Sequence, residues 1–495
     1  MHELTEPRPS CPTPQNSPAD GSSADASSAA STVVGDTVVG DTVVGDTVVG
    51  DIVVGDIEQF LQEAIAHLEA FEPDEADRPS AGRPRVLPSL ALWAGMLVCI
   101  LRGFSSQLAI WRLLSHKQLW FYPRFPVSDQ AVYNRLESEG VLPLVRLFCQ
   151  ISLVIRERLA PLVDSSLAPF ASEVLALDES TLDKIARMLP ALRGIPKGDK
   201  RLLPGKLVGL FDVRRQQWWK VEHIADAHQN EKVACRGVLK GLAKGSLILF
   251  DLGYFAFAWF DYLTAEGYYF VSRFRLKTSY KVLHVFYQKT IPAGELAGEV
   301  FDGIVWLGAF RADKAARAVR LVRFSVGGKE RVYITNVLDP NLLSLQEIAR
   351  LYARRWDFEL AVKLIKRHLK LHLFWSSKSV IILQQVFAVL IISQVLQALR
   401  LEIAGRAGVD LFDVSMALLV EYLPEYAYTG EDPIEVFVTE GRALRFIRPS
   451  RRKVVEAPMI EPHEIAPLPP DLVLIREPRY AGKQHTNPST LPGDT

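Results

Sequence analysis

Two short apolar runs, each ending in an aspartate, constrain the fold of this sequence most strongly. They are Val-Leu-Ala-Leu-Asp178 and Leu-Ile-Leu-Phe-Asp251. A run of four apolar residues is typical of a strand that is covered on both faces, and ligands in α/β sheets sit at the ends of such strands. Two carboxylates at adjacent strand ends would bind hard divalent cations. Taken singly, each aspartate could equally be a turn or helix-capping residue.

Further strands and a helix surround these two runs. Two strands, a helix and then another buried strand indicate an α/β fold with a mixed sheet. Alternating apolar and polar residues at 277–330 predict a small β insertion. Asp212 is a rival carboxylate, but its strand continues toward Trp218 and Trp219. The expected strands are 174–177, 206–211, 217–221, 247–250, 268–275 and 331–337, with a helix at 229–242.

A capped helix carries the most specific signal in the sequence. Ser344 and Glu347 form a capping box, and no glycine or proline interrupts the helical pattern up to residue 366. At about 100° per residue, one carboxylate, four cations and a phenol share a stripe of about 80°. Such a stripe suits a metal ligand among phosphate contacts, although capped amphipathic helices with a solvated face are common. Its members are Tyr352, Arg355, Glu359, Lys363, Lys366 and Lys370.

The spacing Tyr352-x2-Arg355-x3-Glu359-x6-Lys366 reproduces a known family signature. It resembles the Y-R-E-K motif of the insertion-sequence transposases of the IS-four family, which are DDE enzymes with a ribonuclease-H-like core. Asp251-Leu-Gly-Tyr-Phe is similar to the second motif of that family, and Leu-Asp178-Glu-Ser to the first. The resemblance covers residues 90 to 455.

The resemblance implies a catalytic triad of Asp178, Asp251 and Glu359 that binds two Mg²⁺ ions, for which Mn²⁺ can substitute. The ions would activate water, and then a DNA 3′-hydroxyl, for in-line attack on phosphodiesters, as other two-metal sites do. Tyr352, Arg355 and Lys366 would hold the terminal phosphates of the element. The implied partners are double-stranded DNA, both terminal inverted repeats and target, and a second copy of the chain in a synaptic complex. A ribonuclease-H-like nuclease without strand transfer, or a transposase-derived DNA-binding protein, are the alternatives.

The N-terminal region differs in composition from the rest of the chain. Residues 1–86 hold 16 acidic and 4 basic residues, so the remaining chain is basic and compatible with a polyanionic partner. Residues 1–56 combine a Ser, Pro and Asp mixture with five Thr/Ile-Val-Val-Gly-Asp repeats, and they are expected to be disordered. No signal peptide is visible, and four cysteines without a CxxC pair favour a reducing cytosol. With the family resemblance, this implies the bacterial cytoplasm with its nucleoid. The apolar stretches 86–101 and 380–399 are too short or too polar to span a membrane and are expected to be core helices.

The remaining segments give weaker indications of DNA binding. A helical DNA-binding domain is expected at 57–170. Within it, Ser128 caps a helix whose polar face would include Arg135. This face suits contact with DNA but could equally be an ordinary solvated face. Trp306 in the β insertion could stack on an unpaired base, or simply pack. The catalytic domain is expected at 171–400. It is followed by a helical and basic C-terminal region at 401–455, which could dimerise, and by a Pro-rich tail at 456–495. The C-terminal region ends in a basic run that contains no acidic residue. The run could contact DNA nonspecifically or could simply be a solvated segment. It comprises Arg442, Arg445, Arg448, Arg451, Arg452 and Lys453.

Overall fold

A computed structural model describes most of the chain after the pentapeptide array. The helix α1 (Val54–Glu69) begins inside the last repeat, slightly before the boundary expected at residue 56. The expectation of disorder for the preceding residues lies outside the described part. The structure describes residues 54–69, 86–116, 118–182, 193–196, 205–226, 229–309, 313–429, 431–452 and 455–480.

A nine-stranded mixed sheet forms the centre of the fold, in the order β3-β2-β1-β4-β5-β9-β8-β7-β6. The strand β1 pairs antiparallel with β2 and parallel with β4, and β4 pairs parallel with β5. This order and direction of the first five strands form the expected ribonuclease-H-like core. The strands are β1 (Val174–Thr181), β2 (Lys206–Asp212), β3 (Gln217–Ile224), β4 (Leu247–Phe250), β5 (Tyr269–Arg273), β6 (Tyr280–Ile291), β7 (Gly298–Leu307), β8 (Val319–Val326) and β9 (Lys329–Thr335).

The expected β insertion extends this same sheet. The strand β9 pairs antiparallel with β5 on one side and with β8 on the other, so β6 to β8 continue the hydrogen-bonded ladder. The described part of the Pro-rich tail lies along these strands, where isolated bridges join Arg317 to Ile475 and Lys314 to Arg479. Tyr480 donates a hydrogen bond to Oδ2 of Asp261 at 2.7 Å. The tail therefore packs on the insertion.

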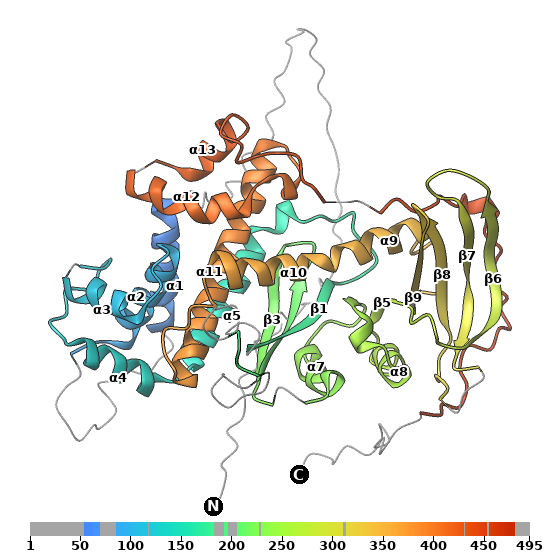
Figure 1. The fold of residues 1–495 in the computed structure, drawn as a ribbon, viewed down its shortest axis with the longest axis horizontal. Helices are drawn as coiled ribbons and strands as arrows, with labels where there is room; N and C mark the ends of the chain where they lie inside the picture. Colours follow the sequence, from blue (N-terminus) through green and yellow to red (C-terminus); the bar gives the residue numbers. More distant parts are fainter. Residues whose placement is uncertain are drawn as a thin grey trace, which may run out of the picture. The chain divides into compact units, whose positions relative to one another are not determined.

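Each face of the core sheet has its own hydrophobic cluster, as the unbroken apolar runs predicted. Along β1, Val174 and Ala176 belong to one cluster, whereas Leu175 and Leu177 belong to the other. The helices α7 (Glu231–Leu239) and α8 (Phe257–Ala265) contribute to the cluster of Leu175 and Leu177. Figure 1 shows α7 and α8 on one side of the sheet and the helices α9 and α10 on the other.

A long helix, α11 (Ser379–Ala407), packs against both the N-terminal helices and the sheet. Its buried Gln394 donates to Oγ of Ser152 on α5 at 2.8 Å and to the carbonyl of Trp218 on β3 at 2.9 Å, and its Oε1 accepts from the Trp218 amide. The other helices of this region are α2 (Ser89–Leu101), α3 (Gln107–His116), α4 (Asp129–Glu139), α5 (Leu142–Arg158), α12 (Met416–Thr429) and α13 (Pro433–Thr439).

Both apolar stretches of the sequence are core helices, as expected. Every residue of α2 is buried. The helix α11 is long and apolar enough to cross a membrane, but 83% of its most apolar window is buried inside the protein. The side-chain amides of Gln384, Gln385 and Gln394 are hydrogen-bonded to neighbouring elements, which is how a core helix accommodates polar groups.

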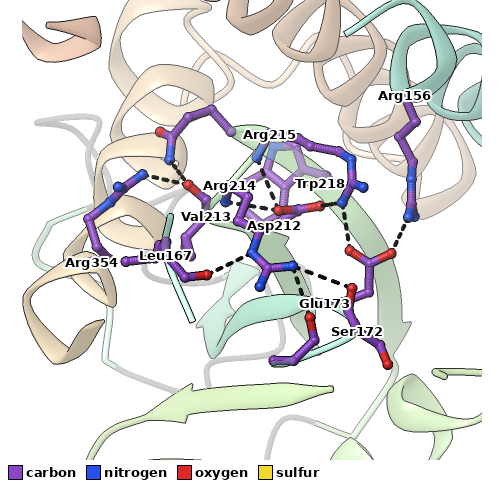
Figure 2. Close-up of polar contacts among 12 residues, drawn as sticks. Arg156, Leu167, Ser172, Glu173, Asp212, Val213, Arg214, Arg215, Trp218 and Arg354 are labelled. Carbon is purple, nitrogen blue, oxygen red and sulfur yellow. Dashed lines mark hydrogen bonds and ion pairs between the residues drawn. The ribbon is translucent and has the colours of Figure 1, made fainter. Parts of the chain in front are cut away.

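Asp212, the rival carboxylate, has a structural role at the turn between β2 and β3. Its carboxylate accepts hydrogen bonds from the amides of Arg214 and Arg215 and forms an ion pair with the Arg215 guanidinium at 2.6 Å. Arg215 and Arg156 of α5 both pair with Glu173, directly before β1 (Figure 2). The Arg214 guanidinium donates to the carbonyls of Leu167, Ala168 and Ala171. This network fixes the start of β1 to α5 and to the turn.

The predicted helix after residue 344 is present, but it is not continuous. The capping box forms as expected, with Oγ of Ser344 accepting from the Glu347 amide and Oε2 of Glu347 accepting from the Ser344 amide. The helix is interrupted at Arg355 and ends in a π-helical turn, a feature that is frequent at functional sites. The three parts are α9 (Leu345–Arg354), α10 (Trp356–Lys363) and the π-helix η5 (Leu364–His368).

Gly209 of β2 allows α10 to lie close to the sheet. It pairs with Asp178 of β1, and a Cβ atom there would lie 2.9 Å from Cζ3 of Trp218 and 3.3 Å from Cε2 of Phe358 on α10. A glycine inside a strand often marks such a close approach.

We expect Gly209→Val to lower the free energy of unfolding by about 1–3 kcal/mol, because the added carbons would push on Trp218 and Phe358 in a packed core. Chemical denaturation monitored by tryptophan fluorescence measures the change. Gly194→Val is the control, since nothing lies within 4 Å of a Cβ atom at Gly194. Equal stability of the two variants would show that α10 does not need the glycine.

Candidate active site

The pairing of the parallel strands brings Asp178 and Asp251 to the same level of the sheet. Val174 pairs with Leu247 and Ala176 with Leu249, so continuing this register sets Asp178 beside Asp251, directly after β4. Asp251 also caps the short 3-10 helix η4 (Leu252–Tyr254), and its Oδ1 accepts from the Gly253 amide at 2.8 Å. The capping role and the place at the strand end are therefore combined in one residue.

Glu359 reaches the same edge from α10, and Arg355 links it to Asp178. The Arg355 guanidinium donates to Oε1 of Glu359 at 2.7 Å and to Oδ2 of Asp178 at 3.3 Å. The interruption of the helix at Arg355 lies at this contact. The structure thus joins residues that are far apart in the sequence, as the resemblance implied.

The electrostatics of Asp178 reflect this crowding of carboxylates. The pKa of Asp178 is raised from 3.8 to about 6, mainly by burial; the negative charges of Asp251 and Glu359 contribute to the rise, and the Glu179 amide and Arg355 oppose it. A carboxyl group among other carboxylates gains from any cation that approaches it. In this structure that cation is Arg355.

The donor chemistry of the site fits a divalent metal ion, but the described side chains are not arranged around one. Three carboxylates offer the oxygen ligands that Mg²⁺ prefers. Among the described residues, however, no group of three or more His, Cys, Asp or Glu is placed to hold a metal ion. The Arg355 guanidinium contacts two of the carboxylates, so it must move before Asp178 and Glu359 can share an ion.

Tyr352 lies beneath the site rather than on its surface. Its side chain is buried against Tyr333, with the ring centroids 5.0 Å apart, and the guanidinium groups of Arg273 and Arg355 lie over its ring at 5.5 and 6.0 Å. Burial raises the pKa of Tyr352 to about 12, so the phenol stays protonated at neutral pH. Its contact with DNA phosphates remains a prediction.

A groove of about 730 Å³ opens beside the carboxylates, and its charged lining consists of three acidic and three basic side chains. Lys363 and Lys366 line it, as the helical stripe predicted, together with Asp178 and Glu359. Nζ of Lys366 donates to Oγ of Ser180 at 2.6 Å. The groove can therefore place a polyanion next to the acidic residues.

Three of the predicted DNA-binding residues lie elsewhere. Lys370 follows the π-helix with a φ of 55°, and its Nζ donates to the carbonyl of Gly103 at 3.0 Å, because the helix does not continue as expected. Arg135 was expected on a polar face, but it is 7% exposed, donates to Oγ of Ser89 and pairs with Glu139. It faces the core because Val132 and Leu136, on the same side of α4, are buried.

Trp306 is also buried, at 7% exposure, in a small cluster with Phe286 and Ile304. The Arg476 guanidinium covers its ring at 4.5 Å. The ring is therefore packed inside the insertion and not presented for stacking on a base, which corrects the expectation from the sequence.

Three basic residues near the site were not expected from the sequence. Arg273 ends β5, and continuing the register from the pair Phe250 and Ser272 places it beside Asp251. Its position at the end of an expected strand could have indicated this from the sequence. Arg367 lines the groove next to Lys366. Lys206 is buried and pairs with Glu179 at 2.8 Å, a contact between strands that no local pattern indicates.

The comparisons with known proteins agree with this geometry. Residues 193–394 match the family described as the transposase DDE domain. This stretch is similar to a transposase DDE domain. The matched residues include Asp251 and Glu359 and begin after Asp178, so the place of Asp178 rests on the pairing of β1 with β4.

Individual relatives of the DDE domain are distant. A stretch of 169 residues is 28% identical to y4zB of Sinorhizobium fredii (strain NBRC 101917 / NGR234), whose name proposes that it is a transposase; the match covers 34% of this chain and 46% of the relative. A cryo-EM structure of a piggyBac transposase synaptic complex with hairpin DNA aligns over 81% of this chain and 84% of its own, at 11% identity and a TM-score of 0.38. That TM-score is too low to carry an argument about this chain.

We expect Asp178→Asn to flatten the pH dependence of stability in metal-free protein. Because the pKa of Asp178 is raised to about 6, the folded state binds its proton more tightly than the unfolded state, so this group makes stability fall as pH rises from about 4 to 6. Thermal melts across that range should show that the melting temperature of the variant rises relative to that of the wild type as pH increases. The exposed Asp471→Asn is the control, and a parallel pH dependence of wild type and Asp178→Asn would contradict the assignment.

Proposed function

We propose that this protein is a DNA transposase of the IS-four type, which cleaves the ends of an insertion sequence and joins them to target DNA. The observation that carries the proposal is the meeting of Asp178, Asp251 and Glu359 at one edge of a ribonuclease-H-like sheet, beside a groove that three basic side chains also line. The match to the transposase DDE domain supports it.

In this proposal, Asp178, Asp251 and Glu359 hold two Mg²⁺ ions, or Mn²⁺ in their place. Bound there, the metal would supply Lewis-acid stabilisation of the attacking and leaving oxygens of a phosphodiester. The protein's own residues position the reacting groups. Lys363 and Lys366 bind DNA phosphates in the groove, and Arg355 exchanges its carboxylate partners for a phosphate when DNA arrives.

The partners follow from the reaction. The DNA partners are the terminal inverted repeats and the target duplex, and two copies of the chain act together in the synaptic complex. Charge supports a DNA partner, since the part of the chain after residue 86 has an excess of basic residues. The site of action is the bacterial cytoplasm, at the nucleoid.

We expect Asp178→Ala, Asp251→Ala and Glu359→Ala each to abolish Mg²⁺-dependent cleavage of end DNA while DNA binding stays within about threefold, because they remove metal ligands rather than phosphate contacts. Gel assays with labelled oligonucleotides measure cleavage and strand joining. Asp471→Ala is the matched control. Cleavage that persists in any of the three removes that residue from the site, and cleavage without joining by the wild type indicates a nuclease.

We expect Lys366→Ala and Arg355→Ala to weaken binding of end DNA and to reduce the slope of log K against log salt by about one each, since each phosphate contact contributes about 0.9. Fluorescence anisotropy at several salt concentrations measures this slope. Lys281→Ala, an exposed cation on β6 away from the groove, should leave it unchanged. Wild-type slopes in both groove variants would mean that these cations do not hold phosphates.

A further inference from the structure

The basic run near the end of the C-terminal region lies at a second pocket, apart from the catalytic groove. This pocket of about 930 Å³ is lined by Arg448, Arg451 and Arg452 of the run, by Arg400 of α11 and by Phe412 of the 3-10 helix η6 (Leu411–Asp413). Four guanidinium groups therefore meet at one hollow, although they are spread over more than fifty residues of sequence.

Arg400 is a buried cation that lacks a carboxylate partner. It is 8% exposed, and its Nε donates to the carbonyl of Val414 at 3.0 Å. Among the described residues, its two terminal nitrogens have no hydrogen-bond partner and no carboxylate lies within 4 Å, while the residue lines the pocket. Burial lowers the pKa of Arg400 to about 10, and the negative charges of Asp357 and Asp410 offset this change only in part.

The carboxylates near this cation are engaged directly by other groups. The guanidinium groups of Arg452, Arg400 and Arg354 lie over the ring of Phe412 at 4.0, 5.3 and 5.5 Å. Asp357, the buried carboxylate beside them, pairs with Arg354 at 2.6 Å and with Arg452 at 2.9 Å. Asp413 also lines the pocket, but its Oδ1 accepts from the Ser450 amide. The cluster thus has an excess of positive charge that a bound anion would balance.

The mouth of the pocket is basic as well, and it adjoins the catalytic groove. Arg448 and Arg451 are exposed and form no ion pair within the described part of the chain. Trp356 and Leu360 of α10 line both this pocket and the groove that holds Asp178 and Glu359. One side of α10 therefore leads from the acidic residues to the arginines.

We propose that the pocket of Arg400, Arg448 and Arg451 binds a backbone phosphate of the DNA whose neighbouring stretch occupies the catalytic groove. Guanidinium groups bind phosphate oxygens through paired N–H donors, and Arg400 has such donors unused and held in place. The inference rests on the proposed function for the identity of the polyanion. It adds a second anchoring point that fixes the direction of the duplex across α10.

Methylphosphonate scanning of end DNA in metal-free buffer tests the contact. Replacing the phosphate that occupies the pocket removes its charge, so binding by the wild type should weaken about tenfold at one or two adjacent positions. The variants Arg448→Ala and Arg451→Ala should bind unmodified DNA more weakly, lose about one unit of salt slope each, and show no further loss at those positions. Arg442→Ala, an exposed arginine of the same run outside the pocket, is the matched control and should scan as the wild type does.

Two further measurements keep the outcomes distinct. Arg400→Lys keeps the charge and removes the paired donors, and its thermal melt shows whether it folds. If it folds, its DNA affinity should no longer depend on methylphosphonate at those positions. If no position is sensitive, or if Arg448→Ala and Arg451→Ala scan as the wild type does, the proposal is wrong. If inorganic phosphate at constant ionic strength stabilises the wild type but not Arg400→Lys, with no sensitive position, the pocket binds free phosphate and the DNA assignment falls.

The same samples separate this inference from the proposed function. Mg²⁺-dependent cleavage and joining are measured with wild type and Arg442→Ala. A position-specific effect without any cleavage or joining supports the pocket and contradicts the transposase proposal. Cleavage and joining without a sensitive position supports the transposase and overturns the pocket.

Discussion

The contact of Arg355 with two carboxylates is the interaction on which the site depends. Asp178, Asp251 and Glu359 lie close together in a half-buried place, and burial, with the added repulsion from the other two carboxylates, raises the pKa of Asp178. A guanidinium between Asp178 and Glu359 offsets this repulsion. The interruption of the helix at Arg355, the close approach of α10 at Gly209 and the parallel pairing of β1 with β4 all converge on this point.

The sequence was informative where local chemistry decides the structure. Apolar runs ending in Asp178 and Asp251 predicted strands buried on both faces, and the capping box at Ser344 predicted the start of a helix; both are confirmed. A strand buried on both faces and a reciprocal cap each leave a short, unambiguous pattern. The roles of the three acids as metal ligands remain predictions.

The features that the sequence did not predict arise from contacts between distant segments. Arg135 lies on the buried side of α4 with Val132 and Leu136, and it donates to Ser89, a contact across 46 residues that no local pattern indicates. The insertion joins the main sheet because β9 pairs on both of its edges, and no composition change marks such a strand. The pocket of Arg400 combines α11, η6 and the basic run, so its excess charge becomes visible only in three dimensions.

The position of Gln394 has a consequence for damaged copies of the gene. Its amide joins α11 to α5 and to β3, so the hydrophobic cluster on that face of the sheet is completed by residues from the last third of the chain. A copy interrupted before α11 would leave this apolar face exposed to water, at a cost of about 25 cal/mol per Å². Its product would aggregate or be degraded rather than accumulate as a soluble fragment.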